Sequence, residues 1–147
     1  MVPPGLTTTT YTFNLVVSDG DASMAATAII TVIINQPVKM VKSFYSDYNS
    51  TNGKIYVTCS QLFTFNVSSY FTDADGDTLS YTISRFNGSS LPSWMGKSST
   101  NVLSGMPGTD SGEILNMLVS VTDNKGYTLN VPLEFYVGCP PENLGRL

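Results

Sequence analysis

The sequence predicts an all-β protein built as a sandwich of two sheets. Apolar and polar residues alternate with a period of two wherever a pattern is visible. No segment sustains the i, i+3, i+4, i+7 spacing of an amphipathic helix. Charged residues make up only 12% of the 147 residues, about half of the usual share. This combination is typical of an all-β extracellular domain.

The first predicted element is a hairpin from Tyr11 to Ile34. Apolar side chains alternate over residues 11–17 and again over residues 28–34, with a turn at Ser18 to Asp21 between them. Both faces of the hairpin carry isoleucine, at Ile29, Ile30, Ile33 and Ile34. An isolated two-stranded hairpin is marginally stable in water, so we expect these faces to need cover.

Further strands follow after a stretch rich in Ser, Tyr, Asn and Gly at residues 39–54, which we interpret as a linker and an irregular first edge. Each strand has one apolar and one polar face, as expected when one side lies on a core. The strands are predicted at residues 55–59, 63–67, 79–83, 115–121 and 129–137.

The last two strands form a second hairpin that matches the first. Placing Asp19 on Asp123 also places Val17 on Val121, at an offset of about 104 residues. A repeat array explains this offset, although any two alternating strands around an Asp/Gly turn look alike. We therefore divide the chain into a hairpin and linker that end a preceding repeat (1–37), a complete domain (38–138) and an exit linker (139–147).

Composition excludes several classes of function. Seven basic against eleven acidic residues give a net charge of −4 without a Lys/Arg cluster, so no nucleic acid is expected as a partner. The sequence has no histidine, hence neither the commonest general base nor the commonest zinc ligand, and we expect no enzyme.

The longest apolar run, residues 25–34, is shorter than the roughly 20 residues of a membrane helix, so no membrane span is expected. Met1 is not followed by a signal peptide, which suggests an internal piece of a longer chain.

Four motifs occur in order: FTDADGDTLSY at 71–81, LPSWM at 91–95, LSGMP at 103–107 and VSVTDNKG at 119–126. Together they resemble the dystroglycan-type cadherin-like domain and the related immunoglobulin-like repeats of large surface proteins. The resemblance covers roughly residues 55–137. It implies an immunoglobulin/cadherin-like Greek-key β-sandwich on a cell surface or outside the cell, and the 104-residue offset is the length of one such sandwich.

The core of this sandwich is expected to include one tryptophan. Trp94 follows Pro92 and would fill the space between the sheets, the alternative being a half-exposed ring that stacks on sugars. Gly105 and Pro107 are expected at a tight corner between strands. The predicted core residues are Trp94, Phe63, Phe65 and Tyr81.

An acidic turn is the candidate metal site. Asp73, Asp75 and Asp77 place three carboxylates within five residues, and oxygen ligands of this kind suit Ca²⁺. The resemblance to cadherins implies that Asp123 joins them, together with residues of the preceding linker. The linker Asn35-Gln36-Pro37 lacks the acidic residues of cadherins, so the affinity should be weak. The alternative is a solvated turn whose side chains bond their own backbone.

Two further sets of residues are candidates for covalent modification. The two cysteines, Cys59 and Cys139, lie at the ends of an early strand and of the last strand. In sandwiches of the kind that the sequence resembles, these two strands often lie side by side and parallel, so we predict a disulfide. The alternative is two free buried thiols. Asn49, Asn66 and Asn87 begin glycosylation sequons, although about three sequons are expected by chance.

Three functions fit these observations. The first is a structural and adhesive spacer in a string of sandwiches, contacting other protein modules. The second is a subunit of an extracellular filament, in which the hairpin completes a neighbouring sandwich. The third is an accessory glycan-binding module of a secreted enzyme. Its only support is a cluster of aromatic residues expected to be exposed, the alternative being that they pack under the linker; these residues are Phe44, Tyr45, Tyr48 and Tyr56.

Overall fold

The computed structural model of the chain describes residues 10–21, 26–47, 54–108 and 113–139. The prediction of an all-β sandwich is confirmed, because strands dominate these residues and the helices are two short 3-10 turns, η2 (Phe44–Asp47) and η3 (Val67–Tyr70). None of the helices in the described ranges is long and apolar enough to cross a membrane.

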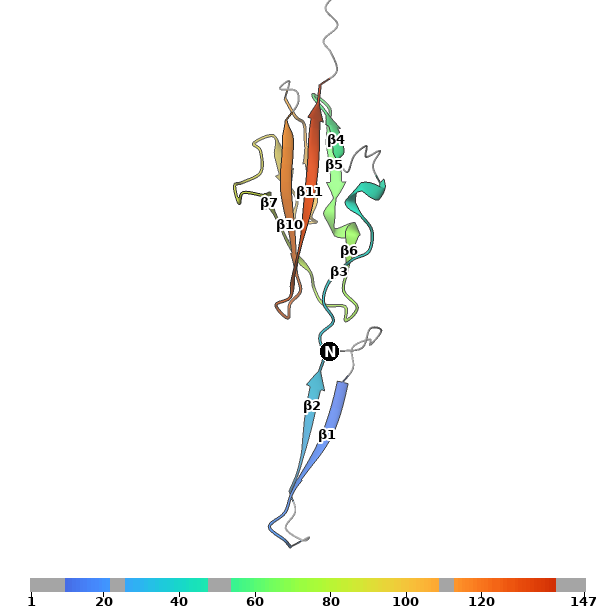
Figure 1. Cartoon of the computed structure of the whole chain (residues 1–147), viewed down its shortest axis with the longest axis vertical. Helices are drawn as coiled ribbons and strands as arrows, with labels where there is room; N and C mark the ends of the chain where they lie inside the picture. The colour runs from blue at the N-terminus through green and yellow to red at the C-terminus, as the bar shows by residue number, and fades with distance from the viewer. Residues whose placement is uncertain (1–9, 22–25, 48–53, 109–112, 140–147) are drawn as a thin grey trace, which may run out of the picture.

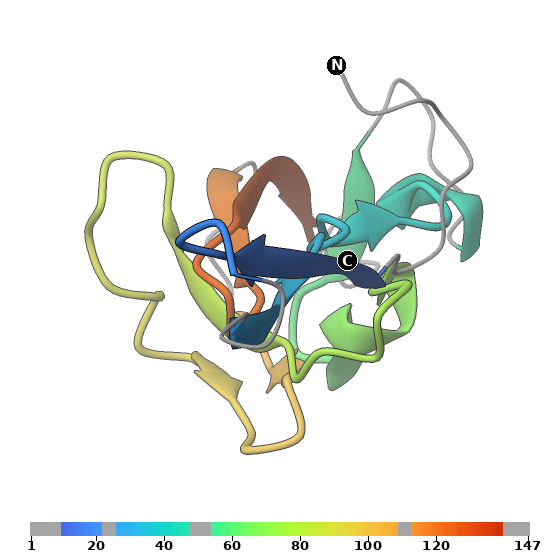
Figure 2. The same ribbon diagram turned by 90° about the horizontal axis from the view of Figure 1, so that it is seen from below.

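Two sheets stack to form the sandwich, as the end-on view in Figure 2 shows. One layer has the order β4-β11-β10-β7, in which β4 and β11 are parallel and the other pairs antiparallel. Its strands are β4 (Ile55–Thr58), β7 (Ser80–Arg85), β10 (Ile114–Thr122) and β11 (Thr128–Gly138). The other layer has the antiparallel order β5-β9-β8. Its strands are β5 (Phe63–Asn66), β8 (Met95–Lys97) and β9 (Val102–Gly105).

A small two-stranded sheet holds the start of the domain against the sandwich. β3 (Lys39–Met40) pairs with β6 (Phe71–Thr72), so the segment after the linker is fixed to the strand that precedes the acidic loop. Figure 1 shows this small sheet near the tip of the sandwich from which the hairpin projects.

The core forms where the alternating apolar residues of the two layers meet. β10 and β11 supply buried side chains at every second position, which is the period of a strand with one face on a core. Phe65 from the opposite layer is 1% exposed and packs edge-on against Phe135, with ring centroids 5.9 Å apart. Aromatic rings in this arrangement gain energy beyond the area that they bury.

The other predicted core residues lie at the margin of the sandwich. Trp94, Phe63 and Tyr81 are partly buried and pack against the core. Trp94 precedes β8, an edge strand, and its ring contacts Phe63 at 6.0 Å between centroids. It therefore covers one side of the core, while Phe65 and Phe135 fill the centre.

Gly105 is the last residue of β9 and pairs with Phe63 of β5 and Met95 of β8, so it lies in the sheet and not in a corner between strands. A Cβ atom at this position would be 2.3 Å from the backbone oxygen of Trp94. Only a residue without a side chain permits β8 to approach β9 so closely.

The hairpin of β1 (Thr10–Val17) and β2 (Ala26–Ile33) projects from one tip of the sandwich (Figure 1). Its strands pair antiparallel, as the sequence predicts. Its large apolar side chains are exposed, with Phe13 at 55% and Ile29 at 70%. Among the described residues, no second layer covers this two-stranded sheet, although such strands normally require one.

Candidate metal centre

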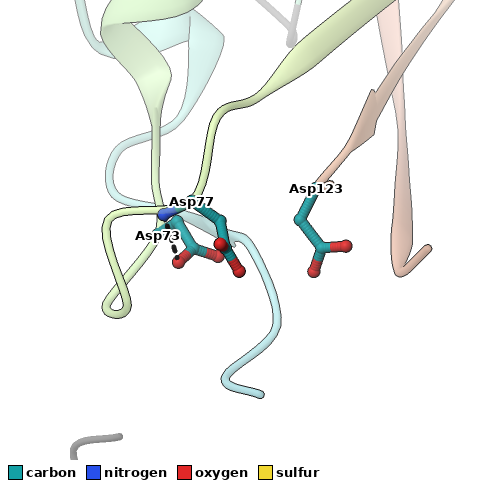
Figure 3. A group of neighbouring side chains, drawn as sticks. All are labelled: Asp73, Asp77 and Asp123. Atoms are coloured by element: carbon teal, nitrogen blue, oxygen red, sulfur yellow. Dashed lines mark hydrogen bonds between the residues drawn. The ribbon is translucent and has the colours of Figure 1, made fainter. Parts of the chain in front are cut away.

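The loop between β6 and β7 curls around one carboxylate. Asp73 Oδ1 accepts hydrogen bonds from the backbone N–H groups of Asp75 at 2.9 Å and Asp77 at 3.2 Å. Gly76 between them has a φ of 75°, a conformation that side chains rarely adopt. The short polar residues and the glycine therefore produce a tight loop in which Asp73 and Asp77 lie close together (Figure 3).

The turn between β10 and β11 is organised in the same way around Asp123. Asp123 Oδ1 accepts from the backbone N–H groups of Lys125 at 2.9 Å and Tyr127 at 2.8 Å. The residue is only 3% exposed, so its charge is largely removed from water. In Figure 3, Asp123 faces the two aspartates of the β6–β7 loop from the neighbouring turn.

The linker that leaves the hairpin is bonded to both loops. Asn35 Nδ2 donates to Asp123 Oδ2 at 3.0 Å, and the backbone N–H of Gln36 donates to Asp75 Oδ2 at 2.6 Å. Linker, β6–β7 loop and β10–β11 turn therefore form one structural unit, which we call the acidic junction and define by Asn35, Gln36, Asp73, Asp75, Asp77 and Asp123.

Three carboxylates of the acidic junction come together as the sequence predicts, and the fourth does not. One oxygen each from Asp73, Asp77 and Asp123 lies within 4.8 Å of the others. Asp75 is outside this group, because its carboxylate accepts the hydrogen bond from Gln36. These three carboxylates, all of which the structure describes, are close enough together to bind one metal ion.

Several buried oxygens at the acidic junction have no hydrogen-bond partner among the described residues. They are Asn35 Oδ1, Asp73 Oδ2 and Asp77 Oδ2. The nearest ion pair is weak, since Lys125 Nζ is 3.9 Å from Asp77 Oδ1 and its side chain is largely exposed. Buried oxygens without donors are costly unless a cation binds them. Asn35 was not predicted as a ligand, because the linker of cadherins supplies acidic residues, yet an amide oxygen is an equally suitable ligand for a hard cation.

The hydrogen bonds at the junction favour the charged form of Asp123. The Asn35 side chain makes the largest contribution to lowering the pKa of Asp123, and burial of the carboxylate opposes it. The backbone N–H groups of the turn lower the pKa further. Asp123 is therefore ionised at neutral pH, as a metal ligand must be.

The predicted disulfide between Cys59 and Cys139 is confirmed. It joins the ends of the parallel strands β4 and β11, and Cys59 N also donates to the backbone oxygen of Gly138. The described residues contain no free cysteine. Disulfides of this kind are typical of proteins from oxidising compartments.

Two of the three predicted glycosylation residues lie on the described surface. Asn66, at the end of β5, and Asn87, in the turn after β7, are both exposed. Asn49 lies outside the described residues.

Of the four aromatic residues considered for glycan binding, the three that the structure describes do not form one exposed cluster. Phe44 is a core residue at 1% exposure, and its ring contacts the rings of Phe65, Tyr70 and Phe71. The Tyr45 hydroxyl accepts a hydrogen bond from the backbone of Glu134, whereas Tyr56 is 48% exposed and contacts Tyr136. Tyr48 lies outside the described residues. The expectation that Phe44 is exposed is wrong, because its ring packs against the rings of Phe65 in β5 and Phe71 in β6.

The chain belongs to the He_PIG family, which is described as "Putative Ig domain" and whose model matches residues 46–137. The match covers more than half of the chain and begins after the hairpin. The narrower resemblance to dystroglycan-type cadherin-like domains stays a prediction.

None of the curated proteins matches the chain. Among solved structures, it is similar to a nucleoside hydrolase-related hypothetical protein from Saccharophagus degradans that is associated with carbohydrate metabolism, at 18% identity and a TM-score of 0.48, over 72% of this chain and 26% of that one. It is also similar to the endo-fucoidan hydrolase MfFcnA4 from glycoside hydrolase family 107, at 20% identity and a TM-score of 0.43, over 89% of this chain and 18% of that one. The chain thus spans about a quarter or less of the length of these structures.

Proposed function

We propose that the chain is a non-catalytic spacer of a secreted or cell-surface protein in which immunoglobulin-like sandwiches follow one another, joined by a Ca²⁺-binding acidic junction. The hairpin is then the last two strands of the preceding sandwich. The observation that carries this proposal is the equivalence of the first hairpin to β10 and β11.

The two hairpins pair their strands in the same register. In the first, Thr10 pairs with Ile33 and Val17 with Ala26. Adding 104 to each number in β1 and 103 to each number in β2 converts all of these pairs into pairs of β10 and β11, from Ile114 with Tyr136 to Val121 with Leu129. The turns also agree, because Asp21 N donates to Asp19 Oδ1 just as Lys125 N donates to Asp123 Oδ1.

This equivalence identifies the face of the hairpin that needs a partner. The side chains Tyr11, Phe13, Leu15, Ile30 and Val32 correspond to Leu115, Met117, Val119, Leu133 and Phe135. The latter five are at most 1% exposed, whereas the former five are each at least 39% exposed. A contiguous apolar face of this kind on a two-stranded sheet requires a second layer.

The free edges of the hairpin have defined partners under the same equivalence. β11 receives β4 as a parallel neighbour, and β10 receives β7 as an antiparallel one. A preceding sandwich would supply both strands and the covering layer from the same protein. A neighbouring chain that supplied them would instead produce a filament, the second candidate function, and the exposed hairpin face supports both arrangements.

Ca²⁺ fits the chemistry of the acidic junction. Carboxylate oxygens of Asp73, Asp77 and Asp123 and the amide oxygen of Asn35 are hard ligands, which suit Ca²⁺ and not the softer metals that prefer histidine or cysteine. A bound ion would neutralise carboxylates that now lie close together with one distant lysine. It would also join the linker to both loops and so limit bending between consecutive sandwiches.

A fusion protein tests the equivalence of the hairpins. A second copy of residues 38–113 is placed directly before residue 10, so that β1 and β2 take the place of β10 and β11 in the added copy. The added Cys59 is changed to serine (Cys59→Ser), because its partner is not duplicated. We expect the backbone amides of residues 10–17 and 26–33 to exchange with solvent at least about tenfold more slowly than in the chain alone, since they become part of a packed sandwich.

Two matched variants control this experiment. Phe13→Asp places a charge on the face that corresponds to the core, and Thr12→Asp places the same charge on the opposite face. The first should abolish the protection in the fusion and the second should largely retain it. Equal exchange rates in the fusion and in the chain alone would contradict the equivalence. Protection that rises with the concentration of the chain alone would favour the filament.

A further inference from the structure

We infer that Asn66 and Asn87 are acceptor sites for N-linked oligosaccharides on the folded sandwich. Each begins an Asn-X-Ser sequon, and in each the structure brings together the two groups that define the motif. The inference depends on local geometry and exposure, not on the number of sequons.

The asparagine and serine side chains of both sequons are in direct contact. Asn66 Oδ1 accepts from Ser68 N at 3.1 Å and from Ser68 Oγ at 2.8 Å. Asn87 Oδ1 accepts from Ser89 N at 3.0 Å and from Ser89 Oγ at 2.7 Å. The same arrangement of three atoms, the asparagine Oδ1 and the serine N and Oγ, therefore occurs twice, on unrelated parts of the fold.

This arrangement fixes the orientation of the reacting amide. A backbone N–H can only donate, so the atom of each asparagine that faces the serine N–H must be the oxygen. Nδ2 then points away from the contact, and no hydrogen bond from Nδ2 of Asn66 or Asn87 is found among the described residues. The nitrogen that must form the new bond is thus left accessible on an exposed side chain.

The contacts span only two residues along the chain, so they can form before the sandwich folds and persist after it. Asn66 also caps η3, because its side chain accepts the Ser68 N–H at the start of that turn. Replacement of one Nδ2 hydrogen by a sugar leaves Oδ1 free to keep this role. The fold and the modification are therefore compatible at both positions.

The reaction is a transfer from a lipid-linked oligosaccharide diphosphate. Nδ2 attacks the anomeric carbon of the first sugar and forms a C–N bond, and the C–O bond to the diphosphate breaks. The diphosphate leaves with the electron pair, and Nδ2 loses one proton. No oxidation or reduction is involved.

The positions of the two acceptors suggest what the glycans do. Asn66 is the last residue of β5 in one layer, whereas Asn87 lies in the turn after β7, an edge strand of the other layer. An unpaired edge strand is prone to pair with other chains, and a hydrophilic glycan beside β7 would hinder this. A spacer in a long array would remain separate from its neighbours.

Mass spectrometry of the whole chain, secreted from a eukaryotic cell behind a cleavable leader, tests the inference. Enzymatic release of glycans in ¹⁸O water converts each occupied asparagine into labelled aspartate, which peptide mapping locates. We expect labelled aspartate at positions 66 and 87. Ser68→Ala should remove the label at 66 and Ser89→Ala at 87, whereas the neighbouring Ser69→Ala and Ser90→Ala should leave both labels unchanged.

The serine-to-alanine variants lose only the hydroxyl, so the hydrogen bond from the backbone N–H to the asparagine Oδ1 is kept in each sequon. An intact disulfide between Cys59 and Cys139 verifies that each secreted variant is folded. Absence of label at both positions in the secreted, disulfide-bonded chain would overturn the inference. Label at only one position would overturn it for the other, and occupancy that survives Ser68→Ala and Ser89→Ala would show that the serine contact is irrelevant.

Discussion

Asn35 and Asp123 are 88 residues apart in sequence, and the side-chain nitrogen of the first lies 3.0 Å from a carboxylate oxygen of the second. Asn35 belongs to the linker after the hairpin, and Asp123 to the turn that closes the last two strands of the sandwich. The bond therefore makes the position of the linker depend on the sandwich. It also explains why Asp123 can be buried without a basic partner.

Replacing Asn35 by alanine should destabilise the sandwich by about 1–3 kcal/mol, because a buried carboxylate loses its side-chain donor. Urea unfolding followed by the fluorescence of Trp94 would measure this. Asn14→Ala, an exposed asparagine in β1, should change the free energy of unfolding by less than about 0.5 kcal/mol. Equal effects of the two changes would show that the bond between Asn35 and Asp123 contributes nothing.

Stability should decrease in acid because of two carboxylates. The pKa of Asp123 is lowered from 3.8 chiefly by Asn35, and that of Asp47 chiefly by Lys42. A folded pKa below the unfolded one means that the unfolded chain binds more protons in this range, so the contribution is complete above about pH 4 and is lost as pH falls through the folded pKa values.

Asp123→Asn isolates the charge of Asp123, since an amide oxygen can still accept from Lys125 and Tyr127. Its free energy of unfolding should depend less steeply on pH below about pH 4 than that of the unchanged chain. Urea titrations at several pH values would measure both slopes. Identical slopes would contradict the role assigned to the Asp123 carboxylate.

The close approach of β8 and β9 gives a test of the packing. Gly105→Ala should destabilise the protein by about 1–3 kcal/mol or more, because the new Cβ would lie 2.3 Å from the Trp94 oxygen. Gly96→Ala is the matched control in β8, where a Cβ meets no atom within 4 Å. Thermal unfolding of the two variants compares them directly, and similar melting temperatures would contradict the placement of Gly105.

The disulfide should make a large contribution to stability. Cys59 and Cys139 are separated by 80 residues, and closing a loop of this length stabilises a fold by about 4 kcal/mol in the chain-entropy model. The double variant Cys59→Ser with Cys139→Ser should lose roughly this amount in urea unfolding. An unchanged free energy of unfolding, with a reducing agent present or absent, would contradict it.

The sequence predicted the long strands well, because β10 and β11 alternate over many residues and one face of each lies on the core. It did not identify β8 and β9, because their sequences, MGK and VLSG, show no alternation of apolar and polar residues, whereas the equally short β4 and β5 do alternate. Phe44 could not be placed for another reason. It lies in an irregular segment, and its burial depends on the rings of Phe65, Tyr70 and Phe71, which are distant in sequence.

The acidic junction could be predicted from the sequence only in part. Asp73 and Asp77 share one short loop, so their proximity follows from the sequence alone. The resemblance to cadherins added Asp123. The role of Asn35 and the different role of Asp75 depend on how the linker crosses the tip of the sandwich, which only the tertiary structure shows.

The acidic junction is the part of the proposed spacer that would limit bending between consecutive sandwiches, and calorimetric titration with Ca²⁺ tests it most directly. The unchanged chain should bind one Ca²⁺ with a Kd of roughly 10⁻⁴ to 10⁻³ M, and its melting temperature should rise with Ca²⁺ concentration. Asp77→Ala should abolish binding, because it removes one of the three clustered carboxylates, whereas Asp19→Ala, in the hairpin turn that is equivalent to the turn of Asp123, should leave it intact. Absence of a binding isotherm and of any rise in melting temperature at about 10 mM Ca²⁺, well above this Kd range, would contradict a Ca²⁺-stabilised junction.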